Sequence, residues 1–480
     1  MGNGRYWLHT LGCPKNEVDS EKLAGRLAAD GYRPAPGPAE ADLVVVNTCA
    51  FIEAARQESI DTVLELADVR RDGARLVVTG CMAERYGDEL AAALPEVDLV
   101  AGFGTPLAPP APLEAAVPVT IGARRGPDDR QAAQSSQRGP DAAGFDLLEL
   151  ERPPAGRPWA YVKVAEGCDR ICGFCAIPSF RGRQRSRSRD DVLREVASLV
   201  EGTGTGDGVQ EIVLVAQDLA SYGRDRSARR AGGRSGTVAR AASATGATAP
   251  GRPAPIVTLT REVAALVPRT RLLYLYPSGL TDELVSAVLD TGVPYFDLSL
   301  QHVSRPLLAR MRRWGDGERF LRRIEEIRAA EPAATFRSSF ILGYPGETES
   351  DHDLLLAFLR AARLDWAGFF PFSPEEGTHA VGLDAQVPPA LAMERLRECA
   401  ELQDGITAAR RDLLVGEVRQ VLVDAPGVAR TVHEAPEIDG IVQVPGWLPA
   451  GDLVDVVITG SLGTDLVAEP VAVARAGAVP

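Results

Sequence analysis

The sequence predicts an α/β protein of three parts: an N-terminal open parallel α/β domain, a central partial (β/α) barrel and a small C-terminal all-β barrel. Three observations support this prediction. Apolar runs of strand length alternate with helical runs over residues 6–93, and the alternation resumes from Trp159 onward. After residue 412, only short strand-like runs remain, with turn residues between them.

The N-terminal domain is expected to span residues 1–103. Its βαβαβα order implies a parallel sheet with right-handed crossovers. The pure apolar run Leu43–Val46 is typical of a buried parallel strand. The expected strands are Tyr6–Thr10, Leu43–Val46 and Leu76–Thr79, and the expected helices are Glu17–Ala29, Phe51–Ala67 and Ala83–Ala93.

Residues 104–156 are rich in Pro, Ala, Gly, Gln and Ser, and we interpret them as a linker that contains one strand at Val117–Ile121. The central domain is expected over residues 157–387, because repeated βα units over about 200 residues predict a full or partial barrel. Its expected strands are Tyr161–Val164, Ile212–Ala216, Leu272–Tyr276, Tyr295–Leu300 and Ser338–Leu342, and its expected helices are Asp191–Val200, Thr281–Leu289, Arg305–Met311, Gly317–Ala330 and Glu349–Arg363.

A long connecting helix is expected at residues 388–411, and a small all-β domain is expected at residues 412–480. The strands of this last domain are predicted at Val418–Val423, Gly440–Val444, Asp452–Ile458 and Asp465–Ala468.

One segment of the central domain, residues 224–253, does not fit the βα pattern. It holds seven arginines and one acidic residue, and the rest is mostly Ala, Gly, Ser and Thr. Such a segment cannot bury enough apolar surface to order itself. We interpret it as a disordered surface insertion, and the alternative is a basic arm that contacts RNA.

Charge and composition exclude several classes of protein. The chain of 480 residues carries a net charge of −14, which disfavours a protein that coats nucleic acid. No stretch approaches the roughly 20 apolar residues that span a bilayer, and the N-terminus lacks the pattern of a secretory signal. Seven cysteines are an odd number for a disulfide framework, so we expect a cytoplasmic protein whose cysteines serve another purpose.

Three of these cysteines form the pattern C-x3-C-x2-C at Cys168, Cys172 and Cys175, directly after a predicted strand. A compact loop can turn three thiolates toward one point, and three ligands leave one iron of an iron–sulfur cube open. The alternative, a structural zinc site, requires a fourth Cys or His, and none lies between Trp159 and Val209.

Three further cysteines, Cys13, Cys49 and Cys81, each follow a predicted strand. The carboxyl ends of parallel strands meet at one edge of a sheet, so these thiolates can also gather around a cluster. Gly12 and Gly80 precede two of them and would let the backbone approach a bulky ligand. From spacing alone, buried cysteines without a function remain the alternative. The seventh, Cys399, has no partner on its predicted helix and is interpreted as inert.

Taken together, these residues resemble the methylthiotransferases of the radical S-adenosylmethionine (SAM) superfamily, whose signature is the C-x3-C-x2-C spacing. Within the superfamily the chain resembles most the RimO branch, which modifies an aspartate of ribosomal protein S-12. The resemblance covers nearly the whole chain except residues 104–156 and 224–253. The stretches that carry it are Thr10–Glu21, Asn47–Ile52, Gly80–Tyr86, Ala176–Arg187, Tyr274–Gly279, Gly343–Thr348, Ser373–Thr378 and Ala435–Gly440.

The resemblance implies a three-domain fold: an N-terminal cluster domain, a radical SAM partial barrel and a C-terminal TRAM barrel. It implies two [4Fe–4S] clusters, one on each cysteine trio, and SAM. One SAM would methylate a sulfur on the N-terminal cluster, and a second would yield the radical that removes hydrogen from the β-carbon of the aspartyl residue. No side-chain base could deprotonate that unactivated C–H bond, so no catalytic side chain is expected.

The resemblance also implies a SAM pocket and several partners. The pocket would be lined by Phe174, Gly343 and Glu347, and Gln217 is added because it ends the predicted strand Ile212–Ala216, on the face where barrels perform chemistry. Packing beneath the loop is the alternative for Phe174, and an ordinary turn is the alternative for the other three. The arginines from Arg181 to Arg189 are read as a solvated or substrate-facing strip. The expected partners are S-12, free or on the small subunit, an electron donor and a sulfur donor, with no membrane and with RNA contact through the Arg-rich insertion left open.

The charge of the C-terminal domain bears on the substrate. From Asp412 to Pro480 there are ten acidic and three basic residues, a net charge of −7. Such a domain repels phosphate and complements a basic ribosomal protein. The alternatives are a tRNA adenosine methylthiotransferase with the same clusters and a non-catalytic iron–sulfur redox or assembly scaffold. The stretch Thr464–Ala468 lacks the aromatic residue that is expected on the last strand.

Overall fold

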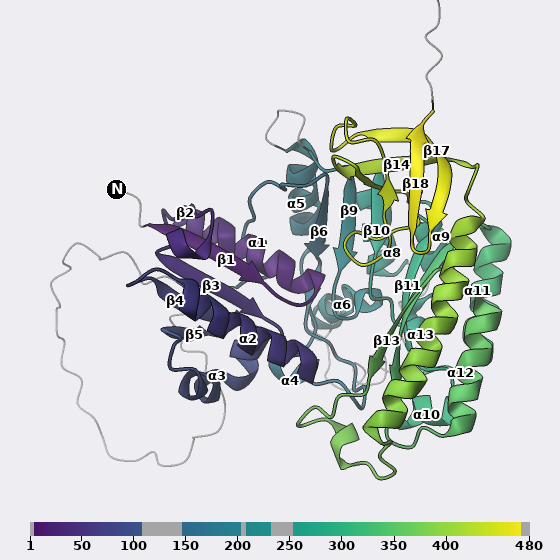
Figure 1. The fold of residues 1–480 in the computed structure, drawn as a ribbon, viewed down its shortest axis with the longest axis horizontal. Coiled ribbons are helices and arrows are strands. Elements are labelled where there is room, and N and C mark those ends of the chain that lie inside the picture. Colours follow the sequence, from purple (N-terminus) through teal and green to yellow (C-terminus); the bar gives the residue numbers. More distant parts are fainter. Residues whose placement is uncertain (1–3, 108–145, 203–207, 232–252, 472–480) are drawn as a thin grey trace, which may run out of the picture. The chain divides into compact units, whose positions relative to one another are not determined.

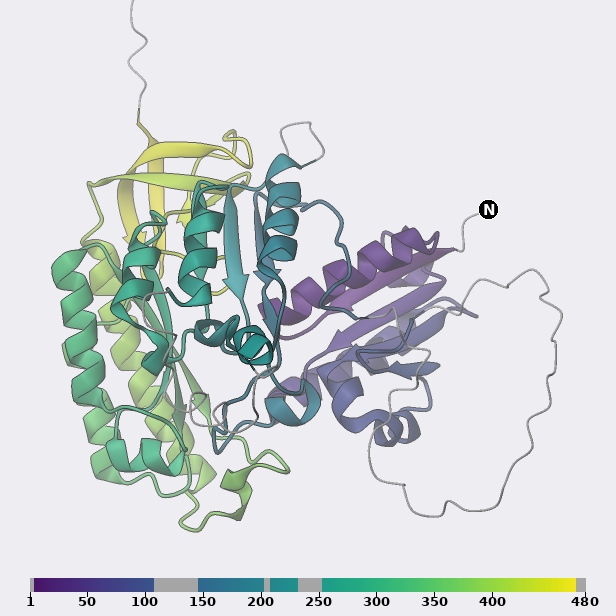
Figure 2. The same cartoon turned by 180° about the vertical axis from the view of Figure 1, so that it is seen from behind.

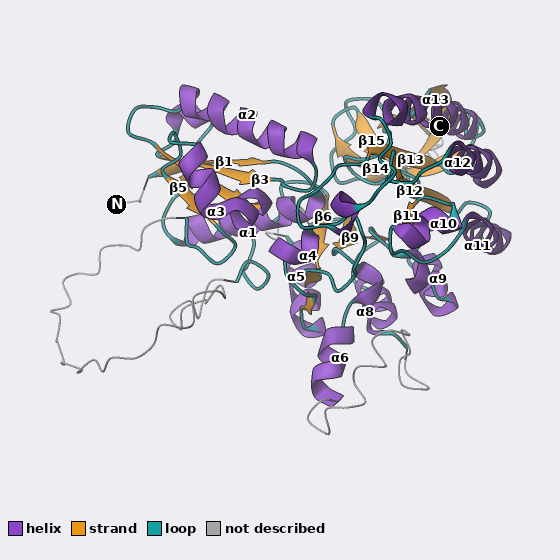
Figure 3. Ribbon diagram, turned by 90° about the horizontal axis from the view of Figure 1, so that it is seen from below, coloured by secondary structure: helices purple, strands orange, loops and turns teal. Residues whose placement is uncertain are grey.

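A five-stranded parallel sheet forms the N-terminal part of the computed structural model, which describes residues 4–107, 146–202, 208–231 and 253–471. The strand order is β2-β1-β3-β4-β5, so successive connections run in opposite directions from a switch point between β1 and β3 (Figure 1). Helix α2 covers one face of the sheet and α1 covers the other (Figure 3). The elements are β1 (Arg5–Thr10), α1 (Pro14–Ala29), β2 (Arg33–Pro34), β3 (Leu43–Thr48), α2 (Glu53–Val69), β4 (Arg75–Gly80), α3 (Cys81–Ala93) and β5 (Leu99–Ala101).

The central strand of this sheet, β3, is buried along its whole length. A run of branched apolar residues suits such a position, because both faces of the strand are covered by helices. The prediction of a buried parallel strand at Leu43–Val46 is therefore confirmed, as is the open parallel α/β architecture. The strand expected at Val117–Ile121 lies outside the described residues.

The central part is a partial barrel built from two parallel three-stranded sheets, β10-β9-β6 and β11-β12-β13. A parallel bridge between Leu275 and Leu298 joins the two sheets. Helices α11, α12 and α13 line up along the outside of the second sheet (Figures 1 and 2). The strands are β6 (Trp159–Lys163), β9 (Glu211–Val215), β10 (Arg269–Leu272), β11 (Tyr295–Gln301), β12 (Thr335–Leu342) and β13 (Trp366–Pro371), with a small hairpin β7 (Ala165–Glu166) and β8 (Arg185–Ser186).

Helices separate most of these strands. Cys399, on one of these helices, is buried in the apolar core, and this burial raises the pKa of its thiol to about 12. Such a buried neutral thiol agrees with an inert residue. The helices are α4 (Ile177–Phe180), α5 (Arg189–Glu201), α6 (Arg224–Ala231), α8 (Pro255–Ala264), α9 (Asp282–Leu289), α10 (Arg305–Arg310), α11 (Gly317–Ala330), α12 (Glu349–Ala362) and α13 (Pro389–Asp412).

Two expectations for the central domain need correction. The strand expected at Leu272–Tyr276 ends at Leu272; of residues 273–276 only Leu275 makes a β-bridge, to Leu298, and Tyr274 lies in the left-handed region at φ 66°. The start of the insertion 224–253 is ordered, because Arg224–Ala231 forms helix α6. Asp225 of this helix accepts a hydrogen bond from the backbone N–H of Ser186, which anchors the helix to β8.

The C-terminal part is a closed five-stranded barrel, which confirms the expected all-β domain. Its apolar interior includes Leu466, at the place where an aromatic residue was expected, so this side chain fills the barrel core. The strands lie in the order β14-β15-β16-β18-β17. They are β14 (Val418–Ala425), β15 (Val428–Arg430), β16 (Val442–Gln443), β17 (Leu453–Leu462) and β18 (Asp465–Pro470).

The chain between β15 and β16 packs against the amino-terminal ends of the partial-barrel strands. Arg430 reaches Glu211 at the start of β9, with 2.9 Å between its Nη1 and Oε2. Tyr161 donates a hydrogen bond to the carbonyl oxygen of Pro436, and Trp366 donates one to the carbonyl oxygen of His433. These contacts close the end of the partial barrel opposite the carboxyl ends of its strands. Within the described ranges, no helix combines the length and apolarity that a membrane span needs.

Candidate active site

The loop with Cys168, Cys172 and Cys175 joins the hairpin strand β7 to α4, beyond the carboxyl end of β6. Two backbone hydrogen bonds shape it: the N–H of Cys168 donates to the carbonyl of Gly182, and the N–H of Cys175 donates to that of Cys172. Gly167 adopts φ 76°, and a Cβ there would collide with the carbonyl of Gly182. The tight turn before the first cysteine therefore requires glycine.

The surroundings of these thiols suit a metal-containing group, whose positive charge favours the thiolate form. Burial raises the pKa values of Cys168 and Cys175 to about 12, so both thiols stay protonated at neutral pH unless a metal displaces the proton. The Nη1 of Arg313 lies 3.2 Å from the Sγ of Cys172 and can donate to a thiolate there. The donor set thus fits an iron–sulfur cluster.

A single metal ion fits the described residues less well. Across the described ranges, no three His, Cys, Asp or Glu side chains are close enough together to hold one ion. The cysteines of an iron–sulfur cube bind different iron atoms and need not converge on one point. The C-x3-C-x2-C spacing, with no fourth Cys or His between Trp159 and Val209, favours a cluster over the zinc site that the sequence left as an alternative.

Phe174 lies within this loop, and Gln217 contacts Glu166, just before it. Phe174 is half-buried and packs against the apolar core of the partial barrel. Gln217 follows β9, and its Nε2 donates to Oε1 of Glu166 over 2.8 Å. The Oε1 of Gln217 is buried and has no hydrogen-bond partner in the structure, so it can still accept one from a ligand.

Gly343 and Glu347 form the turn after β12. Gly343 has φ 77°, and its N–H, like that of Tyr344, donates to the buried carboxylate of Glu347. Arg395 pairs with the same carboxylate at 3.2 Å. Glu347 therefore holds the turn in place rather than facing an open space. The hydroxyl of Tyr344 packs close to Gly173 of the cysteine loop, which links this turn to the cluster loop.

The other three cysteines each follow a strand of the N-terminal sheet. Cys49 comes directly after β3 and Cys81 directly after β4, and the last residues of these strands, Thr48 and Gly80, are register partners. Both cysteines are buried. Cys13 lies three residues beyond the end of β1, the strand on the other side of β3. The strand order makes the junction of β1 and β3 the switch point where open α/β sheets bind ligands.

Local contacts fix the backbone beside Cys49 and Cys81. Ser59 of α2 accepts a hydrogen bond from the N–H of Cys49 at 3.2 Å. Gly80 has φ 92°, and a Cβ there would collide with the backbone of Thr48. Only glycine therefore allows the end of β4 to lie this close to β3. Ser59 was missed in the sequence, where a serine in a helix carries no signal of such a role.

A second structural unit contains residues 153–480 together with the short segments 13–18 and 51–54. Within it, the buried carboxylate of Glu166 pairs with Lys163 at 2.6 Å and with Arg181 at 2.9 Å. Burial acts to raise the Glu166 pKa, but these two cations outweigh it and hold the pKa well below its usual range. Arg181 also donates to Asn16 Oδ1 at 2.6 Å.

The arginine strip after the cluster loop is only partly exposed. Arg181 and Arg187 are buried, and Arg187 pairs with Glu195 at 2.6 Å. The Arg183 side chain is 91% exposed. The expectation of a solvated or substrate-facing strip is therefore wrong for Arg181 and Arg187, because each neutralises a buried carboxylate.

Comparisons with known proteins agree with this architecture. Residues 5–102 match the family described as "Uncharacterized protein family UPF0004", residues 162–359 match the radical SAM superfamily, and residues 415–471 match the TRAM domain.

Full-length relatives are also found. The ribosomal protein uS12 methylthiotransferase RimO of a Nocardioides species is 40% identical over 490 residues, which cover 96% of this chain and 96% of the relative. The protein of the same name from Kineococcus radiotolerans is 40% identical over 499 residues, with 96% of each chain covered. That from Moorella thermoacetica is 39% identical and covers 95% of this chain and 96% of its own.

Proposed function

We propose a reaction for this chain from its family: it belongs to the RimO family of ribosomal protein uS12 methylthiotransferases, radical SAM enzymes with a TRAM domain. The reaction is the transfer of a methylthio group to the β-carbon of an aspartyl residue of uS12, the ribosomal protein called S-12 above. The observation that carries the proposal is the similarity over 96% of the chain to enzymes with that name. The cysteine loop Cys168–Cys175 lies beside the carboxyl end of β6, where barrel enzymes perform chemistry.

Two cysteine trios would hold the two clusters. Cys168, Cys172 and Cys175 would bind the cluster that takes SAM, and Cys13, Cys49 and Cys81 would bind the second. The first assignment is supported by the buried thiols and by Arg313, which can donate to a sulfur. The second is supported by the positions of the cysteines at the switch point of the sheet. When bound, the clusters and SAM supply a carbon-centred radical and the methylthio group.

The protein's own residues would position SAM and exclude water from it. Phe174 would provide an apolar surface, and the free Oε1 of Gln217 would accept a hydrogen bond from the ligand. Gly343 would bring the backbone close to the ligand in its left-handed turn, while Glu347 holds that turn by accepting its N–H groups. Glu347 would thus act through the backbone of the turn.

The charge of the C-terminal barrel favours a protein substrate. Residues 412–480, which include the barrel, hold ten acidic and three basic residues, and this net charge of −7 complements a basic protein and repels an RNA backbone. The remaining partners would be an electron donor that reduces the clusters and a donor that replaces their sulfur. Contact with ribosomal RNA through the arginines of residues 224–253 would add to the protein contact without replacing it.

The test uses the anaerobically reconstituted chain with purified uS12, SAM and a reductant. We expect about eight irons per chain, release of 5′-deoxyadenosine and a gain of about 46 Da on uS12. A chain that binds iron but releases no 5′-deoxyadenosine would be a scaffold rather than an enzyme. Modification of tRNA in place of uS12 would reassign the substrate. A content of about four irons per chain would mean that the second cluster is not formed.

A further inference from the structure

Lys15 is a buried lysine whose ammonium group makes no ion pair with a carboxylate, and the Cys13 thiol is the group whose negative charge would act on it most strongly. Lys15 follows Cys13 by two residues, at the start of α1, and is 8% exposed. The Nζ stands 3.2 Å above the centroid of the Tyr274 ring. In the part of the chain that the structure describes, the Nζ of Lys15 has no hydrogen bond and no ion pair with a carboxylate, while the backbone N–H of Lys15 faces the Cys13 thiol. Buried charges are ordinarily paired, so this ammonium group calls for an explanation.

The two carboxylates of this neighbourhood are already occupied by other groups. Glu166 is held by Lys163 and Arg181. Asp297 accepts the backbone N–H of Tyr274 at 2.9 Å and pairs with Arg337 at 3.3 Å.

The support beneath the ammonium group is rigid. Tyr274 adopts the left-handed region at φ 66°, a conformation that a tyrosine keeps only when its surroundings hold it. The hydrogen bond from its N–H to Asp297 supplies that restraint. Because Tyr274 lies just beyond the end of β10, its ring holds Lys15 at the carboxyl end of the barrel strands, the end where barrel enzymes bind substrate.

We propose that Lys15 binds the side-chain carboxylate of the target aspartyl residue and thereby selects an acidic side chain as the substrate. The inference rests on the proposed function. An ammonium group that keeps its donors free and sits on a ring face is a site for an anion. The reacting β-carbon is bonded directly to the carboxyl carbon, so fixing the carboxylate also fixes the carbon that loses hydrogen.

The experiment measures binding of uS12 to the reconstituted chain, anaerobically and with SAM present, without relying on turnover. Two forms of uS12 are compared: the natural protein and a variant with asparagine in place of the target aspartate. The enzyme variants are Lys15→Met, which keeps the length and apolar bulk of the side chain, and Lys15→Arg, which keeps the charge. Lys22→Met is the matched control, because Lys22 is a buried lysine of the same helix that donates to the carbonyl of Leu148.

The natural chain should bind aspartate-bearing uS12 about tenfold or more tightly than the asparagine form, because hydrogen bonds to charged groups are strong. Lys15→Met should bind both forms equally, while Lys15→Arg and Lys22→Met should retain most of the discrimination. Equal discrimination by the natural chain and Lys15→Met would overturn the proposal. A loss of iron in Lys15→Met with its discrimination intact would assign the lysine to the Cys13 cluster and would also overturn it.

These outcomes are separable from a failure of the proposed function. If the natural chain adds no mass to uS12, the function fails. If it adds the mass and Lys15→Met still discriminates between the two forms of uS12, only the role of Lys15 fails.

Discussion

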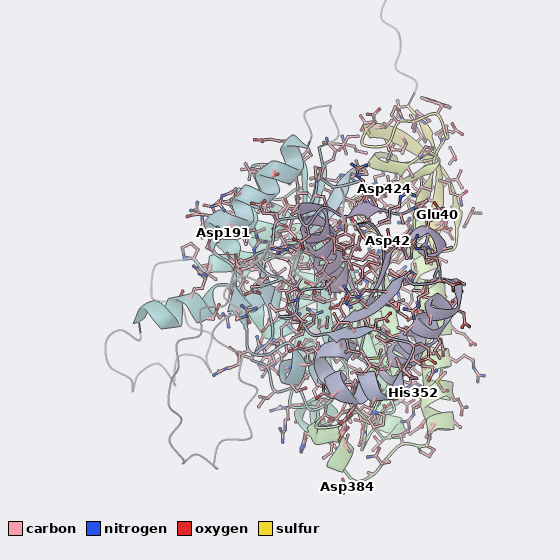
Figure 4. All side chains as sticks on the ribbon, turned by 90° about the vertical axis from the view of Figure 1, so that its left-hand side faces the viewer. Glu40, Asp42, Asp191, His352, Asp384 and Asp424 are labelled. Atoms are coloured by element: carbon pink, nitrogen blue, oxygen red, sulfur yellow. The ribbon has the colours of Figure 1, made fainter. Side chains whose placement is uncertain are left out.

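Glu211 is the centre of a buried ion network, and replacing it should destabilise the protein strongly. Its carboxylate has no exposed surface and pairs with Arg271 at 2.7 Å and with Arg430 at 2.9 Å. Asp424, labelled in Figure 4, pairs with Arg430 from the barrel strand β14. The substitution Glu211→Gln keeps the shape of the side chain but leaves two buried guanidinium groups without their shared counter-ion.

Two arguments give the same magnitude for this change. Burial acts to raise the Glu211 pKa, but the charges of Arg271 and Arg430 outweigh it and lower the pKa from 4.5 to about 2. A shift of this size corresponds to about 3 kcal/mol of folding free energy. Breaking a buried ion pair by removing one partner costs about 3–5 kcal/mol. We therefore expect Glu211→Gln to lower the free energy of unfolding by about 3 kcal/mol at pH 7.

The sign of the pH dependence follows from the direction of the shift. A carboxylate with a depressed folded-state pKa contributes stability above its unfolded pKa and loses it as pH falls from 4.5 toward 2. The difference in free energy of unfolding between the natural chain and Glu211→Gln should therefore be constant from pH 8 to pH 6 and be smaller by about 1 kcal/mol at pH 4.

The assay is urea unfolding of the cluster-free, thiol-reduced chain, followed by tryptophan fluorescence at each pH. The matched control is Glu262→Gln, because Glu262 also pairs with an arginine, Arg189, but the side chains of this pair are 29% and 54% exposed. That change should cost less than about 1 kcal/mol. A loss below about 1 kcal/mol for Glu211→Gln at pH 7, or a gap that does not shrink at pH 4, would refute the reasoning.

Three further predictions concern the cluster sites and a buried histidine. Cys168→Ala and Cys49→Ala should each remove about half of the bound iron, and only Cys168→Ala should abolish 5′-deoxyadenosine release; equal effects of both changes on that release would contradict two separate sites. Gly80→Ala should lower stability by about 2 kcal/mol or more and reduce iron content, measured by urea unfolding and iron analysis, because Gly80 has φ 92° and faces the backbone of β3. Burial lowers the pKa of His302 from 6.5 to about 4 and outweighs the charge of Asp351, which acts to raise it. The stability that the neutral histidine contributes is therefore complete above pH 6.5 and is lost as pH falls toward 4. Between pH 7 and pH 5, the free energy of unfolding of the natural chain should fall by about 2 kcal/mol more than that of His302→Gln in the same assay. An equal fall in both proteins would contradict a buried neutral His302.

Strands β3 and β4 of the N-terminal sheet were predictable because nearly all of their residues are buried, whereas the short strands β2 and β5 were not predicted. The strand at Leu272–Tyr276 was predicted in the wrong place. Strand β10 occupies Arg269–Leu272 instead. Two arginines in four residues argue against a buried strand, but Arg271 is neutralised by Glu211 and Arg269 donates to the carbonyl oxygen of Arg430. These partners are distant in sequence, so the local pattern could not reveal them.

Strand β13 was missed for a different reason. Its sequence Trp366–Pro371 contains Gly368 and ends in proline, and both residues weaken a strand signal. Among the described strands, β13 lies at the edge of its sheet and pairs only with β12. An edge position tolerates proline because one side of the strand makes no ladder hydrogen bonds, which explains why the pattern was ambiguous.

The candidate site was also only partly predictable from the sequence. The spacing of Cys13, Cys49 and Cys81 was interpretable because each cysteine follows a strand, so that each interval is one turn of the βα pattern. The roles of Lys15 and Asn16 could not be predicted that way, because Asn16 meets Arg181 across 165 residues of sequence. The motif beside Cys13 therefore indicates where functional residues lie, whereas the role proposed for Lys15 rests on the buried charges around it, which the sequence does not show.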